Sequence, residues 1–264
     1  MSEADLIAIG GFVVLFGLMA LRVPVGIAMG IVGVGGFAQI TGWGPALNQL
    51  AISPLRTLTD YNTSLIPMFI LMGVFATRSG ISSELFGAAR AWVGHKRGGL
   101  GLATISACAG FAAISGSSVA TAATMSKVAL PEMRSAGYRD ELATGVIASG
   151  GTLGILIPPS VVLAIYGYIT EQDIGTLFIA GVVPGILLGL ILMVVIYIVA
   201  RVKKLPAQPR VSFRQWLHTA QRAFWGLLLL VIILGGIYSG MFTPTEAAAV
   251  AAVYSAFIAL FVYK

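Results

Sequence analysis

Apolar positions along the chain form long charge-free windows rather than short amphipathic stripes. A membrane-spanning helix needs about 20 consecutive apolar residues, and most of these windows approach or exceed that length. They run over residues 6–21, 23–55, 61–77, 98–126, 142–170, 174–200, 223–245 and 247–263. Window 23–55 has room for one helix and a loop through residues 41–45. The pattern predicts an all-α polytopic membrane protein.

Two windows, 98–126 and 142–170, are long for one crossing, and each is interrupted at its centre. The first contains Ser115-Gly116-Ser117-Ser118, and the second contains Ile157-Pro158-Pro159-Ser160. In hydrocarbon, irregular backbone persists only where it lines a polar cavity or binds something. We therefore predict a re-entrant hairpin and a broken helix, and place the candidate chemistry at these two breaks.

The basic residues favour the hairpin. With the N-terminus outside and window 98–126 entering and leaving on one side, 15 of the 16 Lys and Arg residues fall inside, and only Arg56 falls outside. A full crossing by this window would leave 5 inside and 11 outside. Cytoplasmic loops are enriched in Lys and Arg, so the first arrangement is predicted.

Two connecting segments have the pattern of helices at the membrane surface. One begins near residues 82–84, and the other precedes window 223–245. Their apolar stripes are Leu85, Phe86, Ala89, Trp92 and Val93, and Phe213, Trp216, Leu217, Ala220 and Phe224. We expect both at the cytoplasmic interface, where Trp and Arg are favoured, bracing a scaffold.

The start of the chain is echoed near its end. An apolar helix followed by Pro24 and small residues recurs before Pro244, in the opposite predicted orientation. This arrangement is typical of inverted-repeat secondary transporters. It leads us to expect a chain that stops after the first repeat; a half-length protein that pairs with a partner is the alternative.

Composition narrows the function classes. The chain has 264 residues, 58% of them hydrophobic and 10% charged, with a mean hydropathy of +0.94. The net charge of +6 comes from basic residues that lie between the apolar windows. Their placement indicates membrane topology and not nucleic-acid binding. One cysteine and two histidines leave no disulfide framework and little for a Cys or His metal site.

The breaks expose hydroxyls and carbonyl oxygens, and neither window contains an acid or a base. Proline lacks an N–H, so it frees carbonyls upstream of Pro158. Oxygen donors without a carboxylate suit a hard monovalent cation such as Na⁺. A proton relay through a buried carboxylate is not expected here.

Several spaced motifs, in order, resemble the large membrane subunit of TRAP (tripartite ATP-independent periplasmic) transporters, the DctM-like permeases. They are Ile114–Ala122, Pro131–Met133, Gly137-Tyr138, Gly151–Ser160, Tyr166-Gly167 and Phe242–Ala249. The resemblance covers essentially the whole chain. It implies an elevator-type, Na⁺-coupled importer in the bacterial inner membrane with a periplasmic N-terminus. It also implies organic-acid substrates, a periplasmic substrate-binding protein and a small four-helix membrane subunit.

The resemblance also assigns site residues. The expected Na⁺ ligands are Ser115, Ser117, Ser118, Gly154, Ile157 and Pro159, and the expected hairpin-tip and substrate-side residues are Gly116, Gly151 and Thr152. A second hairpin and a second broken helix of the family pattern are absent from these 264 residues.

The predicted segments are scaffold helices (1–60), a third span with an interfacial arm (61–97), a transport block (98–173), a scaffold and an interfacial helix (174–222), and the start of a second repeat (223–264). Two alternatives to a permease stay open: a non-transporting scaffold fragment, and an intramembrane serine hydrolase. The hydrolase needs a histidine at the depth of Ser115 or Ser117, and His95 and His218 both lie in interfacial segments. No enzyme activity is expected.

Overall fold

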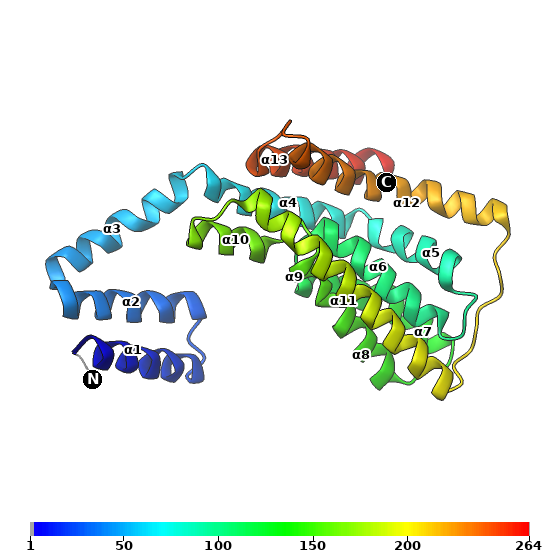
Figure 1. Cartoon of the computed structure of the whole chain (residues 1–264), viewed down its shortest axis with the longest axis horizontal. Coiled ribbons are helices and arrows are strands. Elements are labelled where there is room, and N and C mark those ends of the chain that lie inside the picture. Colours follow the sequence, from blue (N-terminus) through cyan, green and yellow to red (C-terminus); the bar gives the residue numbers. More distant parts are fainter. Residues whose placement is uncertain (1–2, 264) are drawn as a thin grey trace. The chain divides into compact units, whose positions relative to one another are not determined.

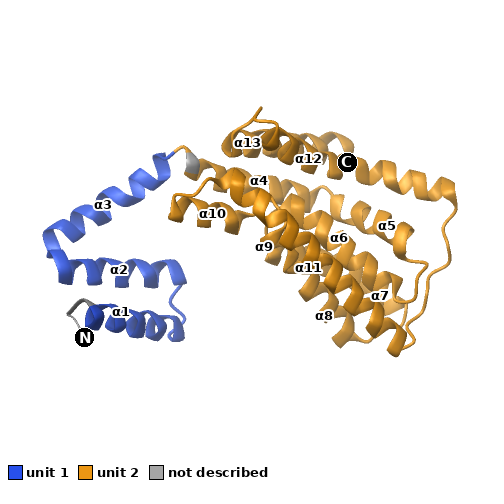
Figure 2. Cartoon of the chain, in the orientation of Figure 1, with its two compact units in different colours: residues 1–60 blue, residues 61–264 orange. Residues whose placement is uncertain are grey.

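The computed structural model describes residues 3–263, and within this range the ordered elements are all helical. The predicted all-α class is confirmed. Residues 1–2 of the predicted segment 1–60 and Lys264 of the segment 223–264 lie outside the described residues. The chain divides into two compact units, 1–60 and 61–264, which are coloured separately in Figure 2 and described separately here.

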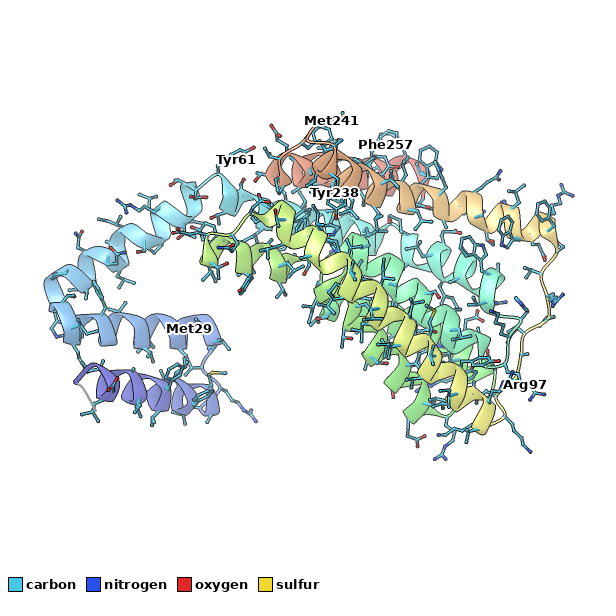
Figure 3. The ribbon with its side chains drawn as sticks, in the orientation of Figure 1. Met29, Tyr61, Arg97, Tyr238, Met241 and Phe257 are labelled. Atoms are coloured by element: carbon cyan, nitrogen blue, oxygen red, sulfur yellow. The ribbon has the colours of Figure 1, made fainter. Side chains whose placement is uncertain are left out.

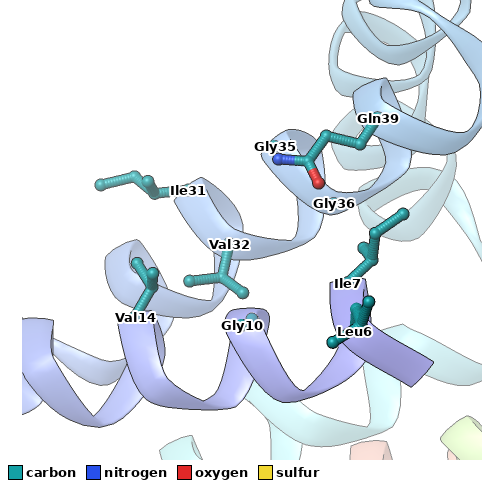
Figure 4. A pocket seen from close by; sticks show the side chains of 10 residues that line it. Leu6, Ile7, Gly10, Val14, Ile31, Val32, Gly35, Gly36 and Gln39 are labelled. Atoms are coloured by element: carbon teal, nitrogen blue, oxygen red, sulfur yellow. The ribbon is translucent and has the colours of Figure 1, made fainter. Parts of the chain in front are cut away.

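Unit 1 consists of α1 (Glu3–Ala20), α2 (Val25–Thr41) and α3 (Trp43–Thr59). The loop predicted over 41–45 is wrong, because Gly42 alone separates α2 from α3. Gly42 turns the chain with a positive φ of 93°, and Pro45 is tolerated in the first turn of α3. A groove of about 510 Å³ between α1 and α2 is lined partly by glycines of both helices (Figure 4).

Unit 2 holds the remaining elements, labelled in Figure 1. They are η1 (Asn62–Ser64), α4 (Leu65–Arg78), α5 (Ile81–Val93), α6 (Gly99–Ser115), α7 (Ser118–Ser135), α8 (Asp140–Gly151), α9 (Leu153–Leu156), α10 (Val161–Thr170), α11 (Ile174–Val202), α12 (Phe213–Tyr238), α13 (Pro244–Phe257) and the π-helical η2 (Ile258–Val262). Helix α6 forms the centre of this unit and contacts α4, α5, α7, α8, α9, α11 and α12.

Helices α6 and α7 form an antiparallel hairpin. Ser115, at the end of α6, bonds Thr121 near the start of α7, and Thr104 of α6 reaches Met133 near the end of α7. The turn needs a left-handed residue, and Gly116 supplies it with φ 60°. Both ends of the hairpin therefore lie together, as the predicted re-entrant window requires.

Helices α8, α9 and α10 form the predicted broken helix. A minor irregularity at Thr152 separates α8 from α9, and the main break covers 157–160. Ser160 begins α10 as its N-cap, with its hydroxyl accepting a hydrogen bond from Leu163 N–H. The sequence thus stops one helix with prolines and starts the next with serine.

Helix α5 leaves α4 at an angle of 66° and packs on α6 and α12. It begins at Ile81 after a left-handed Gly80, slightly before the start predicted at 82–84. The predicted boundary between residues 222 and 223 falls inside α12, which runs unbroken from Phe213 to Tyr238 behind a capping box. The interfacial helix expected before residue 223 is therefore the first part of a longer helix.

The two aromatic segments contact each other. The rings of Trp92 and Trp216 stack with centroids 6.0 Å apart, and Arg222 pairs with Glu84 at 3.2 Å. Together these contacts connect the first half of α12 to α5.

Four helical segments are long and apolar enough to cross a membrane: 140–170, 174–202, 213–238 and 244–262. Counting the bent pair α4–α5 as one span would make five. Helix α6 has 17 residues, about 26 Å, which is shorter than the roughly 30 Å hydrocarbon core. A hairpin that turns back inside the bilayer fits that length.

Candidate functional site

The two breaks lie directly against each other. Val161 N–H donates to the Gly116 carbonyl at 3.1 Å, which joins the start of α10 to the hairpin tip. A Cβ added to Gly116 would lie 2.8 Å from the Pro159 carbonyl oxygen. A Cβ on Gly154 would lie 2.7 Å from the Ser117 carbonyl carbon. Two glycines thus allow backbone segments about 40 residues apart in sequence to touch.

Hydroxyl groups gather beneath the hairpin tip. The Ser115 and Thr121 hydroxyl oxygens are 2.8 Å apart, and the Thr121 hydroxyl donates to the Ser117 carbonyl at 2.8 Å. Ser115 is 3% exposed and Thr121 is fully buried. The Ser117 hydroxyl accepts from Ala120 N–H and so caps α7. These bonds fix the tip without any charged group.

Carbonyl oxygens are left without helical donors at the end of α9. Pro158 and Pro159 have no N–H, so the carbonyls of Gly154 and Ile155 lose their i+4 partners. The Ile157 carbonyl loses its i+4 donor because Val161 N–H donates to the Gly116 carbonyl instead. Within residues 3–263, none of these three oxygens accepts a hydrogen bond.

This donor set fits a small monovalent cation. Carbonyl and hydroxyl oxygens are hard ligands, and they can replace the hydration shell of an alkali ion. In the described range no three His, Cys, Asp or Glu side chains gather as a transition-metal site would require. The predicted residues Ser115, Ser117, Ser118, Gly154, Ile157 and Pro159 belong to the two touching breaks.

A pocket of about 590 Å³ lies between α4 and the hairpin tip. Its lining residues are Ile70, Gly73, Val74, Thr77 and Arg78 of α4, residues 115–120 of the tip, and Val161 and Val162 of α10. Gly73 brings α4 close to the tip, because a Cβ there would lie 3.0 Å from the Ser115 carbonyl oxygen. The pocket walls are mostly apolar, and its polar groups come from Thr77 and Arg78 of α4 and from the serines of the tip.

Gly151 and Thr152 do not line this pocket. Gly151 is buried where a Cβ would meet Ala122 of α7 at 2.8 Å. The exposed Thr152 hydroxyl donates to the Ser149 carbonyl of the preceding helix, α8, at 2.6 Å. The substrate-side role expected of these two residues stays a prediction.

The sequence patterns did not identify four residues that the site uses. Thr121 completes the hydroxyl cluster, and Ser160 caps α10. Gly73 lets α4 approach the hairpin tip closely, and Arg78 lines the pocket. A serine directly after Pro-Pro and before an apolar run is a helix-start signal that would have indicated Ser160. Only the tertiary contact reveals the other three.

The two histidines are placed elsewhere. His95 lies in the turn between α5 and α6, and His218 lines cavities on α12 together with Gln221. Neither lines the pocket at Ser115 and Ser117, so the serine-hydrolase alternative has no base there.

Comparison with known proteins identifies the family of the chain. The family model described as "Tripartite ATP-independent periplasmic transporter, DctM component" matches residues 12–264. The chain belongs to this family.

Three relatives illustrate the similarity. The C4-dicarboxylate TRAP transporter large permease DctM of Pseudomonas aeruginosa is 60% identical over 83% of this chain and 51% of its own length. The DctM permease of Vibrio cholerae is 46% identical, over 96% of this chain and 56% of its own. The sialic acid TRAP permease SiaT of Haemophilus influenzae is 36% identical, over 94% of this chain and 40% of its own length.

The relatives of this TRAP-family chain are transport permeases and not enzymes, and the chain is a multi-pass membrane protein. It spans about half the length of the curated relatives it matches.

Proposed function

We propose that this chain carries a Na⁺ site of a TRAP large permease subunit. In this proposal, the permease couples the import of organic acids to the entry of Na⁺ down its gradient. The observation that supports it best is the contact between the hairpin tip and the helix break, which brings buried hydroxyls to carbonyls without helical donors. The ligands we propose are Ser115, Ser117, Ser118, Gly154, Ile157 and Pro159.

Coupling follows from the same contact. A cation between the tip and the break would link α6–α7 to α8–α10, so that these helices move as one block against the remaining scaffold. Because the breaks share backbone hydrogen bonding and close packing, they can respond together when the cation leaves. The elevator motion is part of this proposal.

The substrates and partners are proposed from the family. Relatives named for C4-dicarboxylates and for sialic acid support organic acids as the substrate class. We propose that the permease works in the bacterial inner membrane with a periplasmic N-terminus, beside a small four-helix membrane subunit, and receives its substrate from a periplasmic binding protein.

The test is Ser115→Ala and, separately, Ser118→Ala in the complete permease, reconstituted with its partners in proteoliposomes. Uptake of a radiolabelled C4-dicarboxylate is measured as a function of external Na⁺. Each substitution removes one hydroxyl ligand from the Na⁺ ion, which is expected to raise the half-saturating Na⁺ concentration roughly 10- to 100-fold.

Ser126→Ala is the matched control, because Ser126 lies on the same helix α7 and its hydroxyl bonds only its own helix, at Ala122. It should retain wild-type Na⁺ dependence. Wild-type uptake and Na⁺ dependence in both Ser115→Ala and Ser118→Ala would show that the site assignment is wrong.

A further inference from the structure

Arg78 brings a positive charge to the pocket at the hairpin tip. It is the last residue of α4, its side chain is exposed, and it lines the pocket with Ser115–Ala120. Within residues 3–263 its guanidinium forms no ion pair and no hydrogen bond. Four other arginines of unit 2 do have carboxylate partners, namely Arg90, Arg134, Arg139 and Arg222. In the same described range, Arg97, Arg201, Arg210 and Arg214 have no such partner, but none of them lines the pocket.

The rest of the pocket reinforces the charge. Among the described residues, no Asp or Glu lines it. Helices α7 and α10 both start at it, from the N-caps Ser117 and Ser160, so the positive ends of two helix dipoles meet there. The cap hydroxyls bond Ala120 N–H and Leu163 N–H, and Val161 N–H is bound to the Gly116 carbonyl. The N–H groups of Ser118 and Val119 in α7 and of Val162 in α10 remain to serve an anion.

We propose that Arg78 binds a carboxylate of the transported organic acid in this pocket. The inference rests on the proposed function and adds a substrate-binding residue that lies on α4, outside the hairpin and the broken helix. A volume of about 590 Å³ suits a small organic acid, since ligand pockets usually measure roughly 300–1,000 Å³. The planar guanidinium can donate two parallel hydrogen bonds to one carboxylate, which a lysine cannot reproduce.

The competing interpretation is that Arg78 only marks the cytoplasmic end of α4. Arg97 provides the matched control, because it is also a basic residue predicted inside but lies at the turn between α5 and α6 (Figure 3). That turn is at the opposite end of α6 from the tip, about 26 Å along the helix. A general effect of lost charge would appear equally in Arg78→Gln and Arg97→Gln.

The first experiment measures the pocket's charge without transport. Val119 lines the pocket and is 76% exposed, whereas Cys108, the one cysteine of these 264 residues, is buried. We label Val119→Cys in the purified, complete permease with an anionic and a cationic methanethiosulfonate. Arg78→Gln should lower the anionic-to-cationic rate ratio about three- to tenfold. Arg78→Lys and Arg97→Gln should leave it unchanged.

The second experiment measures binding. A C4-dicarboxylate should protect the introduced thiol from an uncharged maleimide, and the half-protecting concentration should rise roughly 10- to 100-fold in Arg78→Gln. Arg78→Lys should give a smaller rise, and Arg97→Gln none. Wild-type protection and wild-type labelling ratios in Arg78→Gln would overturn the inference.

The two failures are distinguishable. If the dicarboxylate is bound and Arg78 governs its binding, but Na⁺ does not drive uptake, the coupling proposal fails and the Arg78 inference stands. If Na⁺-driven uptake is normal in Arg78→Gln, the inference fails and the proposed function stands.

Discussion

Replacing Gly154 by alanine perturbs the contact between the breaks at its tightest point. The added Cβ would lie 2.7 Å from the Ser117 carbonyl carbon and 2.8 Å from both the Ser117 oxygen and the Ser118 nitrogen. All three atoms are backbone, so no side chain can rotate away. Either α9 or the hairpin tip must shift, and the oxygens of the two breaks separate.

The magnitude follows from two opposing terms. Overpacking a tight site costs about 1–3 kcal/mol, whereas alanine in a helix is favoured over glycine by about 0.5–1 kcal/mol. Gly145→Ala reports the second term alone, because Gly145 lies in α8 with nothing within 4 Å of its added Cβ, so the difference between the two variants isolates the overpacking cost. The two variants should therefore differ by about 1–3 kcal/mol, or roughly 2–4 °C in Tm for each kcal/mol.

The assay is thermal unfolding of the complete permease in detergent, with Na⁺ and again with choline. Wild type and Gly145→Ala should gain stability in Na⁺, because a ligand that binds only the folded state raises Tm. Gly154→Ala should have a lower Tm and little Na⁺ effect. Equal Tm shifts in the two variants, with the Na⁺ effect intact in both, would refute the packing argument.

Further predictions concern the N-cap of α11 and the aromatic contact between α5 and α12. Hydrogen bonds from the side chain and backbone N–H of Thr176 hold the pKa of Asp173, the N-cap of α11, below its usual value. This stabilisation is present above the unfolded pKa of about 3.9 and is lost as pH falls through the lower folded value. Asp173→Asn should therefore lose less Tm than wild type between about pH 5 and pH 3; an identical acid profile would contradict the assignment. Trp92→Leu removes the stack on Trp216 and should cost about 0.5–1.5 kcal/mol in chemical unfolding beyond the effect of Trp43→Leu, an exposed residue outside the ring pairs of the described chain. Equal losses would show that the stack contributes nothing.

Local chemistry explains why the breaks could be predicted. Gly116 allows a left-handed turn, and Pro158 and Pro159 remove N–H donors, so the sequence itself ends the helices at these positions. Ser117 and Ser160 then start new helices as N-caps. Each of these effects acts within four residues, which is the range over which a sequence pattern is informative.

The contacts between distant segments could not be predicted. The packing of Gly154 on Ser117 and the pairing of Glu84 with Arg222 depend on how helices assemble. Charge patterns assign Arg78 to a side of the membrane and give no information about its pocket. The boundary expected at residue 222 was wrong because α12 continues through a polar face, and polar residues on one face do not end a helix.

The central claim is that the hairpin tip and the helix break together hold a monovalent cation. Thallous ion mimics alkali cations and scatters anomalously, so crystals of the complete permease grown with Tl⁺ test the claim directly. We predict one anomalous peak between residues 115–118 and 154–159 that weakens as Na⁺ is added. A peak elsewhere, or none at these breaks under conditions where Na⁺ drives uptake, would contradict it.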